Sequence, residues 1–164
     1  MTLIGNTFPG SVRYFDIKNA TAYSEHGRFK ASNMVDGNTS TFYASSDTGT
    51  QYPWVQLELT DTESVQGVVV TNRLDCCGER FAKVEVRVGD SEVTKENERL
   101  TIHKNEVCGE YVGPAETGEI VNINCSIPLT GRYVTIQVTD SQIQILKLYI
   151  AEVKIYTQGN SILS

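Results

Sequence analysis

Apolar and polar residues alternate along several segments of the chain, which is the pattern of β-strands with one buried face. Over residues 54–59 the odd positions are apolar, while Gln56 lies on the polar face. The same period of two recurs over residues 83–88 and 132–139, and residues 68–70 form a continuous run of valine. Turn-rich stretches separate these segments, and no amphipathic helix of useful length is present. The pattern predicts an all-β fold, an antiparallel β-sandwich or jelly roll.

The alternation changes phase close to the end of the chain. The even positions from 146 to 150 are apolar, whereas the odd positions are apolar from 151 to 155. One extra residue in a strand turns every following side chain to the other face. We therefore expect a bulge or bend near Glu152.

The length and the net charge of the chain limit the number of domains and the kinds of function that we expect. The 164 residues suit one domain, expected over residues 1–157 with a tail over 158–164. A net charge of −6 argues against binding to nucleic acid, and no apolar stretch is long enough to insert into a membrane. Paired catalytic carboxylates, a Ser/His/Asp context and a phosphate loop are not evident, so an enzyme is not expected.

Two of the four cysteines, Cys76 and Cys77, are adjacent within the octapeptide Arg73–Arg80. Neighbouring Cα atoms lie ~3.8 Å apart, whereas ordinary disulfides need ~4.4–6.8 Å. A bond between them would be a poor staple but a rigid apolar knob between two guanidinium groups. The alternative is that each pairs with Cys108 or Cys125, because four cysteines allow three connectivities. The cysteine spacing does not fit a zinc site.

A second polar motif precedes the octapeptide. Asn33, Asp36 and Asn38 place three oxygen-bearing side chains within six residues, with Gly37 allowing a tight turn. A loop of this kind supplies part of the six to eight oxygens that Ca²⁺ takes, and a distant carboxylate such as Glu152 would complete them. The alternative is an Asx-rich turn that satisfies its own backbone.

The segment from Thr71 to Arg80 resembles the signature of the F-type lectins, or fucolectins, a discoidin-like family. The resemblance extends to residues 31–38, to Phe42 and Tyr43, and to later segments including 151–153. It implies a β-sandwich of the F-type lectin type. It also implies calcium-dependent binding of fucose or a fucose-like terminal sugar, and the disulfides Cys76–Cys77 and Cys108–Cys125.

In the resembled family, two basic side chains donate hydrogen bonds to sugar hydroxyls, an aspartate orients them, and the vicinal disulfide packs on the sugar ring. Arginine suits this role because its fork of donors keeps its charge. The implied sugar-binding residues are Arg73, Asp75, Cys76, Cys77, Arg80, His26, Phe42, Tyr43 and Ser46. The implied calcium ligands are Asn33, Asp36, Asn38, Ser46 and Glu152.

The chain departs from the family at one position. The family's sugar site also contains a histidine, and counting back from Arg73 places Ser46 there. The hypothesis is that His26, in a loop expected at the pocket rim, takes over its hydrogen bond. The departure also supports an alternative function, a discoidin-like protein-interaction or adhesion module that has lost or altered sugar recognition.

Paired cysteines indicate an oxidising compartment. Three glycosylation sequons, at Asn19, Asn38 and Asn124, agree with this. The N-terminus lacks the features of a signal peptide, so we expect a mature domain of a secreted or cell-surface protein. The expected partners are fucosylated or related glycans and glycoproteins, with the chain acting as a homo-oligomer or as part of a multidomain protein.

Overall fold

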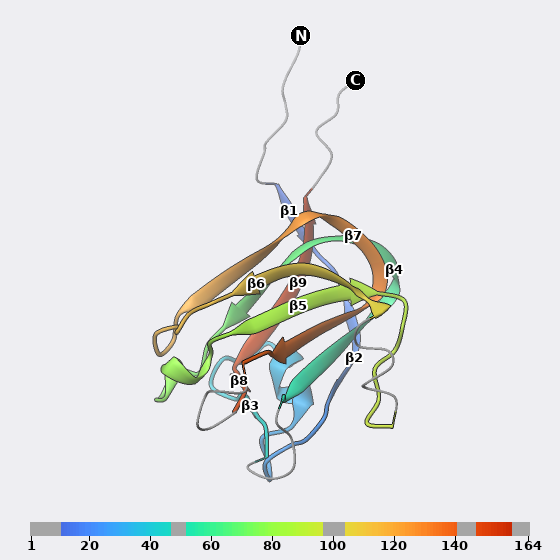
Figure 1. Ribbon diagram of the computed structural model, residues 1–164. Helices are drawn as coiled ribbons and strands as arrows, with labels where there is room; N and C mark the ends of the chain where they lie inside the picture. Colours follow the sequence, from blue (N-terminus) through green and yellow to red (C-terminus); the bar gives the residue numbers. More distant parts are fainter. Residues whose placement is uncertain (1–10, 47–51, 97–103, 141–146, 159–164) are drawn as a thin grey trace.

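The computed structural model describes residues 11–46, 52–96, 104–140 and 147–158 (Figure 1). Strands dominate, and the two helices are short 3₁₀ turns. The strands are β1 Val12–Tyr14, β2 Ile17–Ala22, β3 Tyr43–Ala44, β4 Trp54–Thr71, β5 Val84–Gly89, β6 Glu106–Tyr111, β7 Ile120–Val138, β8 Tyr149–Ile150 and β9 Glu152–Gln158, and the 3₁₀ helices are η1 Ala31–Val35 and η2 Gly78–Arg80. No helix among these residues is long and apolar enough to cross a membrane.

The two long strands, β4 and β7, run antiparallel and pair with each other over most of their length. Their register shifts between Glu58 and Glu63 and again between Val65 and Gly67. The first half of β4 lies between β2 and the end of β7, whereas its second half lies between β9 and the start of β7. The bent strands therefore serve two layers. One is completed by β2, β5 and β6, and the other by β9 and β1. This arrangement confirms the predicted antiparallel sandwich.

The core lies between the two layers and is built from the predicted alternating positions. In β5 the buried side chains are Val84, Val86 and Val88. Gln56 contradicts the predicted alternation, because it is buried rather than on a solvated polar face. Its amide donates a 3.2 Å hydrogen bond to the Val93 carbonyl and accepts one of 2.6 Å from the Val93 nitrogen. A backbone partner at both ends removes the cost of burying the amide.

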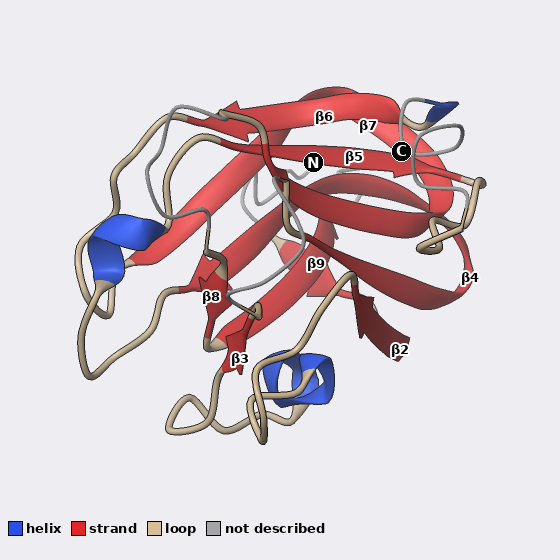
Figure 2. Ribbon diagram, turned by 60° about the horizontal axis from the view of Figure 1, so that its bottom comes forward, coloured by secondary structure: helices blue, strands red, loops and turns tan. Residues whose placement is uncertain are grey.

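The change of phase near Glu152 is more than a bulge. Tyr149–Ile150 forms β8 and pairs with β3, whereas Glu152 begins β9 and pairs with β4. The slip thus marks the point where the chain leaves a two-stranded sheet and enters the main one. Figure 2 shows β3 and β8 together with the 3₁₀ helices and long loops. Figure 1 shows that these elements lie at the end opposite to the outer ends of β1 and β9.

A disulfide joins Cys108 in β6 to Cys125 in β7, as predicted. These strands belong to different layers at this point, because β6 pairs with β5 while the start of β7 pairs with β4. The bond therefore ties the two layers together. The predicted tail over residues 158–164 lies outside the described residues except for Gln158, which ends β9.

Candidate functional site

The loop of residues 73–80, here called the Arg73–Arg80 loop, is fixed to the sandwich by Asn72. This side chain is fully buried. Its amide nitrogen donates 2.9 Å hydrogen bonds to the carbonyl oxygens of Gly78 and Glu116, and its oxygen accepts one of 2.9 Å from the Arg73 nitrogen. A buried polar group with all these partners rigidifies what it contacts. The loop is therefore presented as a unit braced against the segment that contains Glu116.

The vicinal disulfide predicted from the resemblance is present in this loop. Cys76 is bonded to Cys77, with their Cα atoms 3.7 Å apart. Cys77 has a φ of 66°, and the next residue, Gly78, has no space for a side chain because a Cβ there would lie 2.2 Å from the Thr117 backbone nitrogen. Both cysteines are half-buried.

Arg73 is held in one orientation by three side chains. Its Nε donates to Asp75 Oδ1 at 2.6 Å and its Nη2 to Asp75 Oδ2 at 3.2 Å, a bidentate pair. The guanidinium carbon also lies 4.2 Å from the ring centre of Phe42 and 4.9 Å from that of Tyr149. The hydrogen bond from Arg73 lowers the pKa of the Asp75 carboxyl, and the same bond raises the pKa of Arg73. Both groups are therefore charged at neutral pH.

Arg80 approaches the same tyrosine from another direction. Its Nη1 donates a 3.2 Å hydrogen bond to the Tyr149 hydroxyl, and its guanidinium carbon lies 5.6 Å from the ring centre. Tyr149 thus stands between the two guanidinium groups and positions both. Two fixed forks of donors on either side of one ring suit a ligand rich in hydroxyl groups.

Aromatic rings form a row beside Arg73. His26 is stacked on Phe29 with ring centres 6.2 Å apart, and Phe29 on Phe42 at 4.5 Å. Phe42 then meets Tyr149 edge to face at 6.2 Å. The row gives the site an apolar wall next to its charged donors, which is the combination that an amphipathic ligand needs.

Two hollows lie along this row and share Phe29, Phe42 and Arg73. The first hollow, of about 240 Å³, is lined by His26, Phe29, Phe42, Ala44, Ser45, Arg73, Lys147 and Tyr149. The second hollow, of about 640 Å³, is lined by Arg28, Phe29, Asn33, Ser40, Thr41, Phe42, Arg73 and Asp75.

Most residues expected at the sugar site are brought together here. Arg73, Phe42 and His26 line the first hollow, and Asp75 lines the second. Arg80 joins them through Tyr149. The cysteine pair lies on the same loop.

The expectation that Tyr43 contacts a ligand is wrong. Its side chain is fully buried, and its hydroxyl donates a 2.8 Å hydrogen bond to the Ser24 carbonyl. Burial also raises the pKa of the phenol. Neighbouring side chains of a strand point to opposite faces, so the chain places Phe42 at the hollows and Tyr43 in the core. Ser46 is absent from both linings as the described residues define them. Its backbone nitrogen donates to Ser24 Oγ at 3.0 Å.

Five lining residues of the first hollow escaped the sequence prediction, namely Phe29, Ala44, Ser45, Lys147 and Tyr149. A signal for two of them was available. Leu148 and Ile150 are fully buried, and side chains alternate between the two faces of an extended segment. Lys147 and Tyr149 therefore face away from the core, toward the site.

The predicted calcium loop lies beside the second hollow, and its side chains organise its own backbone. Asp36 Oδ1 accepts from the Asn38 nitrogen at 2.9 Å, and Asp36 Oδ2 accepts from the Thr41 hydroxyl at 2.5 Å. Asn33 Nδ2 donates to the Phe42 carbonyl at 3.0 Å. The Phe42 bond links this loop directly to the aromatic row.

Glu152 supplies the strongest sign of a cation. It is 8% exposed, and its Oε1 is buried without a hydrogen-bond partner among the described residues. Burial raises the pKa of its carboxyl and the nearby Asp36 raises it further, while the Gly37 amide lowers it. A buried carboxylate oxygen without a partner is costly, and a cation held between Glu152 and Asp36 would satisfy it. The donor set of carboxylate and amide oxygens fits Ca²⁺.

Comparison with known proteins agrees with the fold. Residues 33–136 match a family described as NedA-like, galactose-binding domain. A fucolectin of Anguilla anguilla is 32% identical over 150 residues, covering 88% of this chain and 88% of that protein. Fucolectin-4 of Anguilla japonica is 37% identical over 109 residues, covering 65% of this chain and 57% of the relative. The chain thus spans nearly all of one relative and little more than half of the other.

Solved structures share the same sandwich. An F-lectin from the serum of the striped bass Morone saxatilis superposes with a TM-score of 0.71 and 24% identity, covering 88% of this chain and 49% of that one. A family 32 carbohydrate-binding module of C. perfringens NanJ, determined with galactose, superposes with a TM-score of 0.68 and 18% identity, covering 85% and 93%. The fold is therefore that of the galactose-binding-like sandwiches. With its sequence match to eel fucolectin, the chain belongs to the fucolectin family of lectins.

Proposed function

We propose that this protein is a calcium-dependent lectin that binds fucose, or a closely related terminal sugar, in the first hollow. The observation that carries the proposal is the arrangement of Arg73, Tyr149 and Arg80. Of the five N–H donors of Arg73, Asp75 uses two, and the proposal assigns others to sugar hydroxyls. Asp75 and the two flanking rings fix the guanidinium before the ligand arrives, so little side-chain entropy is lost on binding.

The apolar surfaces suit the carbon face of a sugar. A 6-deoxy sugar such as fucose carries a methyl group where most hexoses carry a hydroxymethyl group, and the row of His26, Phe29 and Phe42 is a suitable wall for it. The Cys76–Cys77 pair offers a second rigid apolar contact. Polar donors on one side and apolar walls on the other distinguish the two faces of such a ligand.

For the missing family histidine, we keep the hypothesis that His26 supplies the hydrogen bond. The support is its place in the first hollow, where its ring continues the aromatic row. Exchange to phenylalanine keeps the stacking and removes the nitrogen atoms, whereas exchange to glutamine does the reverse. We expect His26→Phe to lower fucose affinity about tenfold and His26→Gln to lower it less, measured by isothermal titration calorimetry. Equal affinity of His26→Phe and the unmodified protein would reduce the role of His26 to packing.

Calcium would be held by Asn33, Asp36, Asn38, Ser46 and Glu152. When bound, the ion supplies positive charge that ties the loop of residues 33–41 to β9. Since Asn33 also bonds the Phe42 carbonyl, ordering this loop steadies one wall of both hollows. The unpartnered Oε1 of Glu152 is the support for this part of the proposal.

The described disulfides support an extracellular location, because bonds of this kind persist in oxidising compartments. A glycan array probed in calcium and in EDTA tests the function as a whole. Fucosylated glycans should bind in calcium, with loss of signal in EDTA. An array without signal would favour the alternative function as a protein-interaction module.

A further inference from the structure

The second hollow lies directly beyond the proposed sugar position. It shares Phe29, Phe42 and Arg73 with the first hollow and is the larger of the two, at about 640 Å³ against 240 Å³. A sugar in the first hollow would direct its attached units across Phe42 into this space. The remaining lining is polar and comes from residues that the proposed sugar contact leaves unused, Arg28, Asn33, Ser40 and Thr41.

Arg28 stands at the tip of a tight turn. The turn is closed by a 3.0 Å hydrogen bond from the Phe29 nitrogen to the His26 carbonyl, with Gly27 at a φ of 58°. The Arg28 carbonyl also accepts from the Lys30 nitrogen at 3.0 Å. Its guanidinium carbon lies 5.2 Å from the ring centre of Phe29. The backbone that carries this charge is therefore fixed at the rim of the second hollow.

Within the described part of the chain, no carboxylate forms an ion pair with Arg28. Among the residues that the structure describes, the nearby ion pairs lie elsewhere, Asp75 with Arg73 and Glu25 with Lys30 at 3.6 Å. An exposed guanidinium beside a polar hollow is a ready donor for an anionic group.

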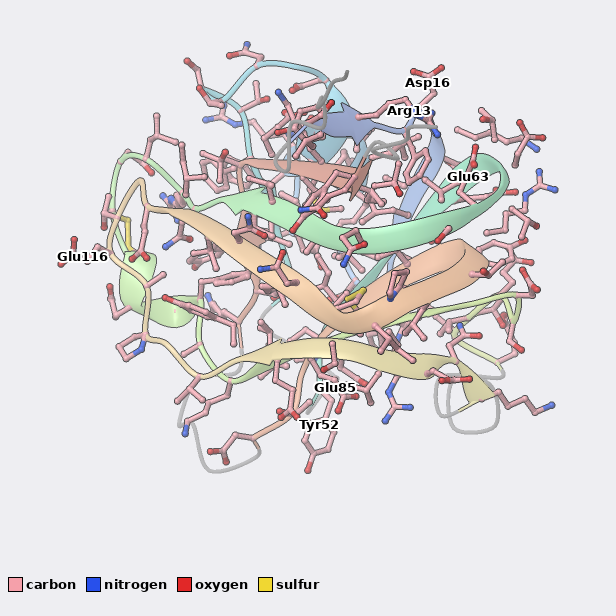
Figure 3. All side chains as sticks on the ribbon, turned by 90° about the horizontal axis from the view of Figure 1, so that it is seen from above. Arg13, Asp16, Tyr52, Glu63, Glu85 and Glu116 are labelled. Carbon is pink, nitrogen blue, oxygen red and sulfur yellow. A yellow bond between two sulfur atoms is a disulfide. The ribbon has the colours of Figure 1, made fainter. Side chains whose placement is uncertain are left out.

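The linings of the two hollows carry a net positive charge, whereas the whole chain is net negative. The protein has 20 acidic and 14 basic residues, and acidic side chains such as Glu63, Glu85 and Glu116 are spread around the molecule in Figure 3. As the described residues define them, the linings contain the positive side chains of Arg28, Arg73 and Lys147 and one carboxylate, that of Asp75. A local excess of positive charge on an acidic protein steers an anion to this end.

We propose that the second hollow is a subsite for an anionic group, a carboxylate or a sulfate ester, on the glycan unit next to the terminal sugar, and that Arg28 binds it. This inference rests on the proposed function. It adds that the protein prefers an acidic glycan to a neutral one.

The test compares three ligands by calorimetry at about 0.15 M salt, near physiological ionic strength. They are a fucosylated oligosaccharide, the same oligosaccharide with a sulfate on the unit next to fucose, and the same one with a sialic acid there. We expect at least one acidic ligand to bind about fivefold more tightly than the neutral one. In Arg28→Gln the ratio of acidic to neutral affinity should fall to about one, and in Arg28→Lys it should fall only in part.

Lys30→Gln is the matched control, because it removes a neighbouring positive charge that does not line the hollow, and it should keep the full ratio. A preference for one acidic ligand alone supports the inference and identifies the anion as sulfate or carboxylate. Equal affinity for neutral and acidic ligands, or a preference that survives Arg28→Gln, overturns the inference and leaves the fucose site intact. Absence of binding to all three ligands overturns the proposed function, and the inference with it.

Discussion

Arg73 and Arg80 are the two basic residues of the lectin signature, but more side chains hold Arg73 in place than hold Arg80. Arg73 has a bidentate carboxylate and two rings, whereas Arg80 has one hydroxyl partner, on Tyr149. The spacing of the two arginines was legible in the sequence. Tyr149 was not, because it comes from a strand 69 residues further on than Arg80, and only folding brings the two together.

Tyrosine 149 should therefore act through Arg80 as well as through its ring. Tyr149→Phe keeps the ring contact with Arg73 and leaves the donors of Arg80 in place, but it removes the hydroxyl that orients Arg80, so we expect fucose affinity to fall about threefold. Arg80→Ala removes charge-assisted donors worth about 1.5–3 kcal/mol and should cost tenfold or more. Calorimetry on both variants checks that Arg80→Ala lowers the affinity more than Tyr149→Phe does. Normal binding by Arg80→Ala would show that the sugar binds elsewhere.

The Arg73–Asp75 pair sets the acid limit of this part of the site. Because the hydrogen bond from Arg73 lowers the pKa of Asp75, the pair is complete above the ordinary aspartate value of about 3.9. Its contribution is lost only as the pH falls through the lowered pKa. With calcium saturating, and in a His26→Phe background that removes the imidazole from the site, fucose affinity should stay level from pH 7 to pH 5. Adding Asp75→Asn should weaken binding several-fold across the whole range. A fall in the affinity of the His26→Phe protein already at pH 6 would contradict this assignment.

At the scale of elements, the sequence predicted strands better than it predicted their partners. The alternation over residues 83–88 matches β5, but the same rule misplaced Gln56, whose partner Val93 lies in a loop that no periodicity reveals. The phase slip near Glu152 was visible as a local irregularity. That it separates a strand of the small sheet from one of the main sheet depends on contacts with β3 and β4.

The two disulfides should have opposite effects. Cys76–Cys77 spans one peptide and so restricts the unfolded chain little, yet it lies on the Arg73–Arg80 loop, which we propose contacts the sugar. We expect the double exchange Cys76→Ser with Cys77→Ser to lower fucose affinity about tenfold and to change the melting temperature by no more than about 2 °C. The measurements are calorimetry and thermal unfolding.

The second disulfide provides the matched control. Cys108 and Cys125 are separated by 17 residues, and closing a loop of this size is worth about 3 kcal/mol. The double exchange to alanine should therefore lower the melting temperature by about 6–12 °C, with fucose affinity retained at 25 °C. A melting temperature equally reduced in both variants would show that the vicinal bond has a structural role as well.

At the scale of the whole molecule, the proposed calcium ion would connect the loop of residues 33–41 to the sandwich through Glu152. A metal that binds the native state alone, at 100 times its dissociation constant, stabilises it by about 2.7 kcal/mol. Removal by EDTA should therefore lower the melting temperature by about 5–11 °C. Glu152→Gln should show no such response, because the carboxylate ligand is lost.

In calcium, Glu152→Gln should lower the melting temperature, because the variant loses the stabilisation by the ion. Without calcium, this effect of Glu152→Gln on the melting temperature should disappear or reverse. The unpartnered buried carboxylate costs stability, so in EDTA at neutral pH the variant should melt at or above the temperature of the unmodified protein. Exchange of the exposed Glu106 to glutamine is the control, and it should respond to EDTA as the unmodified protein does. Identical melting curves with and without EDTA in the unmodified protein would remove the ion from the proposal.

The pairing of β1 with β9 places Val12 directly beside Gln158, at the end of the sandwich away from both hollows (Figure 1). A tether joined at these two positions would therefore meet the domain at the end opposite to the two hollows. If that end were attached to a matrix, to a cell coat or to a second domain, the end of the sandwich with the two hollows would point away from the attachment. Several copies anchored side by side would present parallel sites, so that weak contacts with a densely glycosylated surface could add up to firm adhesion.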